Sequence, residues 1–386
     1  MKVNQIAELI NNILKVEIGE QTTLLTEDLS NVVEVGTTVE NALSYDNYVH
    51  ALVNRIGKMV FNDRKYRGKM LSVLKDNWEY GSIMCEINSS LPDSSVNESW
   101  QLENGTSYDT NVFRAPKAVK SKFFKDIDTY EVQQSITDMQ VKQSFTSAYE
   151  LNAFVEMIFT KIENRLTLDV ENLIKRTINN FIGETIYDSY GSEGLATKST
   201  SKAVNLLYLY NNLHGTTLTA DKCLTDKEFI RFATYTMNKY VDVLQEYSTL
   251  FNIEHLQEFT PKDKLHCVLL SDFKRASDVY LQSDVRHNEL TTLPLTDVVN
   301  NWQGTGLTYA FNDISKINVK TASGHAVEVG GILGVMFDDL ALGVSLENKR
   351  VKTNYVAKSE FTNYYYKEDA RYYNNFSHNF VVFFVA

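Results

Sequence analysis

Three short groupings carry the residue types that acid–base or metal chemistry would use: His255 with Glu258, His266 with Cys267, and Asp338 with Asp339. An imidazole beside a carboxylate can move protons near neutral pH, and an imidazole beside a thiolate can bind zinc. None of these groupings has a second one nearby in the sequence to complete a site. A structural role is the commoner one for such residues, so the sequence predicts no catalytic residue, no metal site and no cofactor.

Motifs for phosphate binding and hydrolysis are also missing. Gly304 and Gly306 form a G-x-G, but Tyr309 occupies the position of the third glycine in a dinucleotide fingerprint. The chain contains no G-x-x-x-x-G-K-[ST] loop, no H-E-x-x-H and no G-x-S-x-G. These patterns therefore give no support to a nucleotide-dependent enzyme, a zinc protease or a serine hydrolase.

A basic run interleaved with phenylalanines is the strongest candidate for a binding surface. It contains Arg114, Lys117, Lys120, Lys122 and Lys125, with Phe113, Phe123 and Phe124 between or beside them. Two partners fit: nucleic-acid phosphates, or an acidic neighbouring subunit. The chain as a whole is acidic, which favours the subunit. The predicted interface residues are Trp100, Phe113, Arg114, Lys117, Lys120 and Lys122.

This basic run belongs to a predicted long hairpin over residues 81–128. Ile83, Cys85 and Ile87 alternate with polar residues, a Ser/Asn/Asp/Gly-rich stretch follows over 91–108, and residues 112–124 return to a strand-like pattern. A hairpin with such a wide polar tip buries little of its own surface. We therefore expect it to pack against a neighbour.

A long helix is predicted over residues 147–183. Ser147 and Glu150 form a capping box at its start, and Gly183 is placed to end it. Apolar residues recur at helical spacing between them, and at 1.5 Å per residue the helix is roughly 50 Å long. A break near Thr167, giving two ordinary helices, is the alternative.

The segments beyond this helix predict a mixed lobe followed by strands. We expect helices over 203–213 and from Thr225, with a T-x-x-E box to Glu228, then a buried strand at 267–270 and a helix at 273–281. Strands are predicted at 332–337, 351–366 and 380–385, and the last of these must be paired within a sheet. Upstream, residues 1–16 have helical periodicity, residues 19–44 predict a polar arm and 45–66 a helical or mixed segment.

Composition sets limits on the class of protein. The 386 residues are 43% hydrophobic and 12% aromatic, which is typical of globular chains. The net charge of −11 argues against a free-standing nucleic-acid binder. Three separated cysteines predict no disulfide framework and suit a reducing compartment. The sequence shows no secretory signal and no apolar run long enough to span a membrane.

Several motifs resemble one viral family. They are Val53-Asn-Arg-Ile-Gly57, Val112-Phe-Arg, Val119-Lys-Ser-Lys-Phe-Phe124, and Ile136-Thr-Asp-Met-Gln-Val-Lys-Gln-Ser-Phe145 leading into the long helix. Together with the order of arm, hairpin, helix, lobe and closing sheet, they are similar to major capsid proteins of tailed bacteriophages, which have the Hong Kong 97 fold. The resemblance is to the small-podovirus branch.

The resemblance implies an α+β fold with a defined division of the chain. Residues 1–44 would form an N-terminal arm, 45–80 the start of a peripheral domain, 81–128 the extended hairpin loop, 129–202 the peripheral domain with its spine helix, 203–330 an α/β axial domain and 331–386 the closing strands of the peripheral domain. Pentamers and hexamers would build an icosahedral shell around double-stranded DNA, contacted without sequence specificity.

The same resemblance implies partners and a location. Scaffolding, portal and head-fibre proteins are the expected partners, no membrane is involved, and the protein belongs in the virion after assembly in the bacterial cytoplasm. Two alternatives stay open: an encapsulin-like cargo compartment of the same fold, and a two-domain enzyme whose site gathers His255, His266 and Asp338. A monomer with an arm and a projecting hairpin favours assembly over both an enzyme and an isolated domain.

Overall fold

The computed structural model describes residue 11 and residues 64–68, 73–75, 84–89, 91–92, 94, 103–106, 119–137, 148–191, 194–282, 296–303, 309–321, 324–359 and 361–386. The predicted N-terminal helix and arm, most of the 45–66 segment and most of the hairpin tip lie outside these residues, as do Ser147, Gly304 and Gly306. The chain divides into two compact units. One comprises Met1–Tyr66, Val132–Arg165 and Val351–Tyr366, and the other Arg67–Glu131, Leu166–Arg350 and Lys367–Ala386. The six-part division expected from the sequence stays a prediction.

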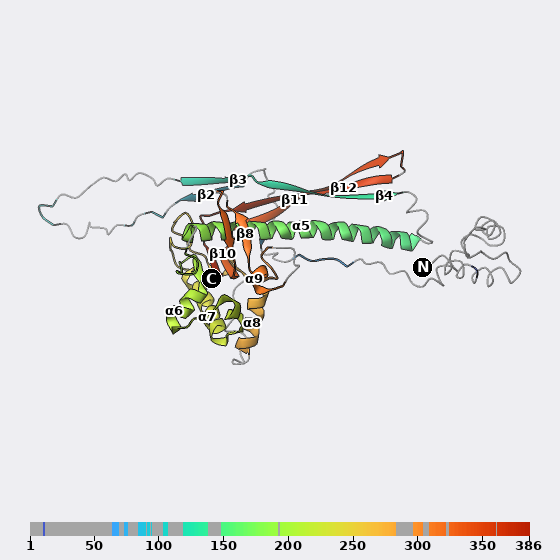
Figure 1. Ribbon diagram of the computed structural model, residues 1–386. Helices are drawn as coiled ribbons and strands as arrows, with labels where there is room; N and C mark the ends of the chain where they lie inside the picture. The colour runs from blue at the N-terminus through green and yellow to red at the C-terminus, as the bar shows by residue number, and fades with distance from the viewer. Residues whose placement is uncertain are drawn as a thin grey trace. The chain divides into compact units, whose positions relative to one another are not determined.

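The long helix α5 runs from Ala148 to Tyr190, a length of 43 residues, without a break at Thr167 (Figure 1). A single helix is therefore confirmed, but the predicted end at Gly183 is wrong. Helix α5 continues seven residues further and stops at Gly191, which adopts the left-handed conformation at φ 63°. Gly183 serves a different purpose, because a Cβ there would lie 2.5 Å from Cγ2 of Val319.

A buried five-stranded sheet forms the core of the second unit. Its strand order is β5 (Ala203–Asn205), β13 (Phe380–Phe384), β10 (Ile332–Asp338), β6 (Leu265–Leu270) and β7 (Thr296–Val299). β13 pairs antiparallel with β10 and parallel with β5, so the predicted pairing of the last strand is confirmed. Every residue of β5, β6, β10 and β13 is buried, which is typical of strands covered on both faces.

Helices cover both faces of β13. On one face, the Phe380 ring stacks on Phe181 of α5 at 4.0 Å between centroids, and Phe384 meets Tyr190 of α5 edge to face at 5.8 Å. On the opposite face, Phe383 contacts Tyr240 at 5.2 Å, on helix α7 (Lys227–Val243). Alternate residues of one strand thus pack on two different helices.

The remaining described helices of this unit are short. They are α6 (Leu206–His214), η3 (Ala220–Thr225), η4 (Lys262–Lys264), α8 (Ser271–Gln282) and α9 (Phe311–Ile314). α8 confirms the predicted helix at 273–281. The helix predicted from 203 begins three residues later, because Asn205 ends β5 and caps α6 through the Tyr208 N–H. The α7 cap is Asp226, which accepts from the Phe229 N–H at 2.8 Å, and not the predicted Thr225.

Three further sheets complete the described strands. A four-stranded sheet has the order β1 (Leu74–Lys75), β11 (Leu342–Val356), β12 (Phe361–Asn374) and β4 (Ile127–Thr137). Two ribbons pair β2 (Met84–Ser89) with β3 (Val119–Phe124), and β8 (Ile317–Lys320) with β9 (Ala326–Val329). The strand predicted at 332–337 is confirmed as β10. The described part of the stretch predicted at 351–366 is strand except at a turn over 357–359, which separates β11 from β12.

Candidate assembly hairpin and its base

The β2–β3 ribbon exposes three large apolar side chains on one face. The two strands pair antiparallel, with Cys85 opposite Phe123, Ile87 opposite Ser121 and Ser89 opposite Val119. These residues form the outer face of the hairpin. Ile87 is 70% exposed, Phe123 65% and Val119 63%. Large apolar side chains are therefore left facing solvent in the isolated chain.

The opposite side of the ribbon carries four polar side chains, of which only that of Lys120 is exposed. Glu86 lies opposite Lys122, and Asn88 opposite Lys120. Side chains alternate along a strand, so these four side chains lie together on the inner face, opposite Ile87 and Phe123. Met84 and Phe124 pair on this same face, and the Phe124 ring lies 5.2 Å from that of Tyr373, so the inner face combines ion pairs with one aromatic contact.

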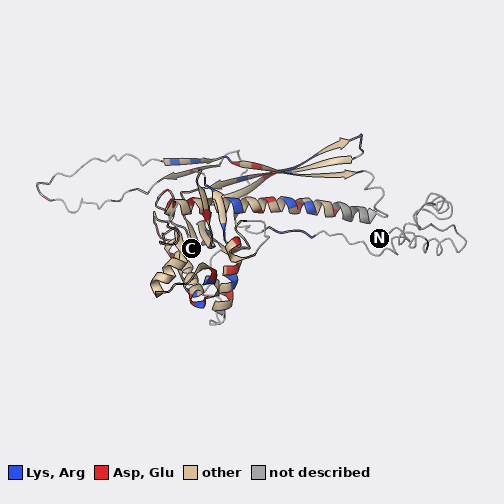
Figure 2. Ribbon diagram, in the orientation of Figure 1, with Lys and Arg blue, Asp and Glu red and all other residues tan. Residues whose placement is uncertain are grey.

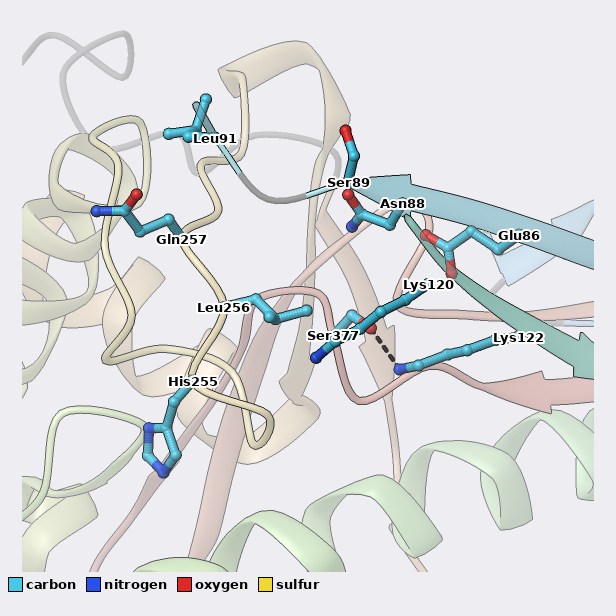
Figure 3. A pocket seen from close by; sticks show the side chains of 10 residues that line it. All are labelled: Glu86, Asn88, Ser89, Leu91, Lys120, Lys122, His255, Leu256, Gln257 and Ser377. Carbon is cyan, nitrogen blue, oxygen red and sulfur yellow. Dashed lines mark hydrogen bonds between the residues drawn. The ribbon is translucent and has the colours of Figure 1, made fainter. Parts of the chain in front are cut away.

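Lys122 holds the inner face onto two loops of the same unit. Its ammonium donates to Glu254 and to Oδ1 of Asn375 at 3.1 Å. It also donates to the Ser377 hydroxyl (Figure 3). Glu254 comes from the loop before β6, and Asn375 and Ser377 from the turn between β12 and β13. A lysine predicted to face another subunit is thus already paired within the chain.

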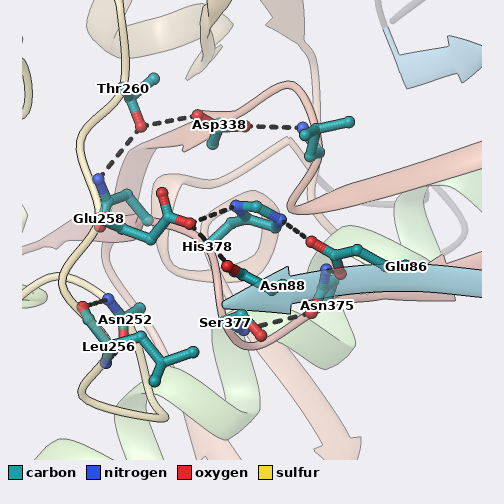
Figure 4. A network of polar contacts seen from close by, with 12 residues as sticks. Glu86, Asn88, Asn252, Leu256, Glu258, Thr260, Asp338, Asn375, Ser377 and His378 are labelled. Atoms are coloured by element: carbon teal, nitrogen blue, oxygen red, sulfur yellow. Dashed lines mark hydrogen bonds and ion pairs between the residues drawn. The ribbon is translucent and has the colours of Figure 1, made fainter. Parts of the chain in front are cut away.

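His378 is the most enclosed ionisable residue of this cluster (Figure 4). Its side chain is 6% exposed, and its Nε2 lies 2.7 Å from Oε1 of Glu86. Its Nδ1 lies 3.7 Å from Oε1 of Glu258, which also accepts from the Asn88 amide at 3.4 Å. The Asn375 amide donates to the second oxygen of Glu86. These contacts tie β2 to both loops, and the cluster is called the hairpin base: Glu86, Asn88, Lys122, Glu254, Glu258, Asn375, Ser377 and His378.

The carboxyl group of Glu258 is perturbed by this environment. Burial raises the pKa of Glu258, His378 and Asn88 oppose that rise, and nearby Asp338 and Glu86 add to it, so that the pKa lies above its usual value of 4.5. The backbone of Glu258 is fixed by two hydrogen bonds with Ser248, of 2.9 and 3.1 Å. These bonds fix the main chain from which the Glu258 side chain reaches His378.

An open pocket of about 260 Å³ lies between the ribbon and the loop before β6 (Figure 3). Its lining residues are Glu86, Asn88, Ser89, Leu91, Lys120, Lys122, His255, Leu256, Gln257 and Ser377. Acidic, basic and apolar groups are mixed in it. The lining gives no preference for one ligand charge.

The other predicted interface residues are only partly described. Lys120 lies on β3 and is exposed, next to the pocket. Trp100, Phe113, Arg114 and Lys117 lie outside the described residues. Their role in contacts between subunits stays a prediction.

The residues of the alternative enzyme hypothesis each have their own structural partner. His255 is exposed, and its Nδ1 lies 3.3 Å from the Thr249 carbonyl oxygen. His266 bonds to Asp339 at 2.9 Å, and Asp338 accepts from the Thr260 hydroxyl at 2.8 Å. Within the described ranges, no three His, Cys, Asp or Glu side chains are grouped so as to hold a metal ion. In the same ranges, every helix is too short or too polar to cross a bilayer.

Sequence reasoning missed the two residues at the centre of the hairpin base. Glu86 and His378 are separated by 292 positions, and neither belongs to a local motif. One signal was available: Glu86 stands between Cys85 and Ile87, so the strand must present a charge on one face and apolar groups on the other.

Comparison with known proteins identifies the family. The family model described as Phi29-like phage major capsid protein matches residues 10–384. The major capsid protein of Bacillus phage GA-1 is 28% identical over 162 residues, which make up 42% of this chain and 33% of that protein. The match thus spans about a third of the length of this curated relative.

Solved structures agree in fold. A chain of the Staphylococcus phage Andhra capsid superposes with a TM-score of 0.55 at 8% identity, over 86% of this chain and 87% of that one. A chain from the structure of the head fibre and inner core protein of native bacteriophage P68 gives 0.50 at 9% identity, over 86% and 88%. The α+β class and the resemblance to phage major capsid proteins are confirmed. Because the family model covers almost the whole sequence, the chain belongs to the Phi29-like phage major capsid protein family, whose members are structural components of the capsid and not enzymes.

Proposed function

We propose that copies of this chain form pentamers and hexamers that close into an icosahedral phage shell around packaged double-stranded DNA. Family membership supports a structural role. The observation that carries the assembly step is the outer face of the hairpin, where Ile87, Val119 and Phe123 are each more than 60% exposed. A neighbouring copy covers this face in the shell.

The energetics favour a protein neighbour over solvent. Fully burying a Val, Ile or Phe side chain contributes about 1.5–3 kcal/mol. Covering three such side chains on each of many hairpins is a substantial part of the free energy that closes a shell. The polar hairpin base cannot supply this cover, because it lies on the other side of the ribbon.

The charge distribution supports a loose contact with DNA. The chain carries a net charge of −11, and basic and acidic residues alternate along α5 (Figure 2). Tight binding of phosphates needs clustered Lys and Arg, and released counterions drive it. Scaffolding, portal and head-fibre proteins as partners, a place in the virion and assembly in the bacterial cytoplasm complete the proposal.

The basic run of the hairpin divides into two roles. Lys122 fixes the hairpin to its own chain. Arg114, Lys117 and Lys120, with Trp100 and Phe113, form the contact with an acidic surface of the neighbouring copy. Lys120 supports this assignment, since it is exposed on β3.

Negative-stain electron microscopy of the purified protein, with sizes checked by light scattering, tests the proposal. Closed shells or capsomer rings are expected for the natural sequence. Phe123→Glu puts a charge on the outer face and abolishes these particles. Phe123→Leu, the matched control, keeps an apolar side chain there and assembles.

Circular dichroism separates assembly from folding. Both variants should keep the helical signal and the thermal midpoint of the unassembled natural chain, because Phe123 is exposed. Shells from Phe123→Glu as abundant as those from the natural sequence would contradict the assigned contact. A uniform monomer or dimer of the natural sequence, even with a scaffolding protein added, would contradict the shell.

A further inference from the structure

The β2–β3 ribbon needs support that its two strands cannot supply. Each strand pairs six residues, Met84–Ser89 with Val119–Phe124, and a lone two-stranded hairpin is at best marginally stable in water. The support lies on the inner face, from which four residues of the ribbon contact other parts of the chain: Glu86, Asn88, Lys122 and Phe124. The described contacts therefore hold the ribbon from its inner side.

Asn375 anchors both strands at one point. Its amide nitrogen donates to Glu86 on β2 (Figure 4), and its Oδ1 accepts from the Lys122 ammonium on β3 at 3.1 Å. An ionised carboxylate only accepts and an ammonium only donates, so the two contacts fix which way the amide is turned. Glu86 and Lys122 are directly opposite each other in the strand pairing. One buried side chain thus joins both strands to the turn between β12 and β13.

The turn that carries Asn375 is itself fixed to the core. The carbonyl of the next residue, Phe376, accepts from the N–H groups of Ile253 and Glu254 at 3.2 and 3.4 Å. The Phe376 ring meets Phe181 of α5 edge to face, at 4.9 Å between centroids. The anchor of the ribbon is therefore complete within one chain, before any second copy is present.

The anchored residues stand next to the exposed ones. Ile87 follows Glu86 on β2, and Phe123 follows Lys122 on β3. Neighbouring side chains of a strand point to opposite faces, so an anchor on the inner face fixes the position of the adjacent apolar side chain on the outer face. Two of the exposed residues that the proposed contact covers are thereby held in a defined orientation.

We propose that the hairpin base sets the orientation of the ribbon before assembly, and that Glu86, Lys122 and Asn375 are positioning residues for the contact between copies. This inference rests on the shell proposed above and specifies how the exposed outer face meets a neighbour. A ribbon that is already ordered loses less conformational entropy when a neighbour binds it than one that moves freely. Chains with a docked ribbon are then the ones that join a particle.

The positioning role predicts a quantitative relation between docking and assembly. When only a fraction of the chains is competent to bind, the apparent dissociation constant equals the intrinsic one divided by that fraction. The chain concentration at which particles first form should therefore rise by the factor by which the docked fraction falls. Residues that only stabilise the fold would not produce this relation.

Hydrogen–deuterium exchange of the full-length chain, below the concentration at which particles form, measures the docked fraction. Lys122→Met removes the ammonium and keeps an unbranched side chain, and Glu86→Ala removes the carboxylate from the other strand. Each variant loses hydrogen bonds to a charged group, so protection of β2 and β3 should fall by about tenfold or more. The double variant should exchange near the rate of an unfolded chain in both strands. Protection of α7 should not change.

Light scattering over a series of concentrations measures the onset of particle formation for the same chains. A double variant whose ribbon is docked in fewer than about one in ten chains should need more than about tenfold more chain. Lys316→Met is the matched control: it removes a lysine of the same unit, just before β8, that pairs with Glu328 and is 46% exposed. The control should match the natural sequence in both measurements.

Two results would overturn the positioning role. One is unchanged protection of β2 and β3 in the double variant, which would show that these residues do not hold the ribbon. The other is lost protection with an unchanged onset of particle formation, which would show that assembly does not depend on docking. If α7 also loses protection in the double variant, the single variants decide by the same two criteria.

Failure of the shell gives a different result. In that case the natural sequence forms no particles at any concentration, and the positioning role falls with the shell. Exchange in the unassembled chains still decides whether Glu86 and Lys122 anchor the ribbon.

Discussion

The five-stranded sheet and the β2–β3 ribbon belong to the same unit, yet they treat apolar residues in opposite ways. In the sheet, Phe380, Phe383 and Phe384 are buried between helices of their own chain. In the ribbon, Ile87 and Phe123 face outward, and the inner face is held by hydrogen bonds and ion pairs. The apolar side chains of the sheet are covered within one chain, whereas those on the outer face of the ribbon are exposed.

This difference suggests that the sheet serves folding and the outer face of the ribbon serves the proposed assembly. The sheet stabilises the folded chain before any partner is present. The exposed apolar side chains of the ribbon contribute little to that stability, and the proposed contact with another copy would cover them. Mutations in the first region should therefore alter folding, and mutations in the second should alter assembly.

The accessibility of the three free cysteines gives the largest expected contrast. Cys85 lies on the outer face and is exposed, whereas Cys223 and Cys267 are buried. Burial raises the pKa of Cys223 from 9.0 to about 12. A rise of that size lowers the thiolate fraction at neutral pH about a thousandfold.

A thiol-reactive dye should label one cysteine per unassembled chain quickly and the other two only after unfolding. Assembled particles should protect Cys85 as well. The Cys85→Ser chain, which has no fast thiol, is the control. Labelling of Cys267 as fast as that of Cys85 would show that the sheet is not closed.

Truncating a phenylalanine should have unequal effects in the two regions. Phe380→Ala removes the ring stacked on Phe181 and leaves a cavity between β13 and α5, so the free energy of unfolding should fall by about 3–5 kcal/mol. Phe123→Ala should change it by less than about 0.5 kcal/mol. Urea denaturation of the unassembled chains measures both. Similar losses from the two variants would remove the distinction between sheet and ribbon.

Acid should weaken the edge of the sheet at Asp339, which follows β10. Burial alone would raise the pKa of Asp339, but hydrogen bonds and charge from Lys75 and His266 outweigh it and hold the pKa below 3.8. A carboxyl group with a lowered pKa contributes stability at neutral pH, and this is lost as the pH falls through that lowered value.

Asp339→Asn should therefore cost about 1 kcal/mol at pH 7, because the pair with Lys75 is partly exposed. The difference from the natural sequence should shrink below about pH 4, as both chains then lack the charge. Urea denaturation at several pH values measures it, with Asp263→Asn, an exposed carboxylate, as control. An undiminished difference at pH 3 would contradict the lowered pKa.

Local patterns predicted the elements better than their ends. Helical spacing from Leu151 to Phe181 was sufficient to predict α5 as one helix. The predicted C-terminal end of α5 was wrong because a glycine in a helix can serve close packing as well as termination. Gly183 allows Val319 to approach the helix, whereas Gly191 has the left-handed backbone conformation that ends it. Thr225 and Asp226 are both residue types that cap helices. Thr225 is the last residue of η3, so Asp226 is the residue with extended backbone that caps α7.

The hairpin base could not be predicted because its residues meet only after folding. The alternation around Cys85 and Ile87 predicted a strand, and pairing with β3 confirmed it. Which face would be buried depends on His378 and Glu258, whose positions are set by the sheet and by the loop before β6. The basic run stays a prediction as a contact between subunits, and the internal partners of Lys122 were out of reach because they lie more than 100 residues away.

The place of β13 in its sheet has a consequence for how the chain reaches its folded state. Val204 and Phe383 are neighbours in the parallel pair of β5 and β13, although almost half of the sequence separates them. Contacts between such distant residues form late and slowly, since a long loop must close first. Any translation product that stops before Phe380 lacks the strand that joins β5 to β10. Such a product should expose open sheet edges on β5 and β10 and be degraded faster by proteases than the full-length chain.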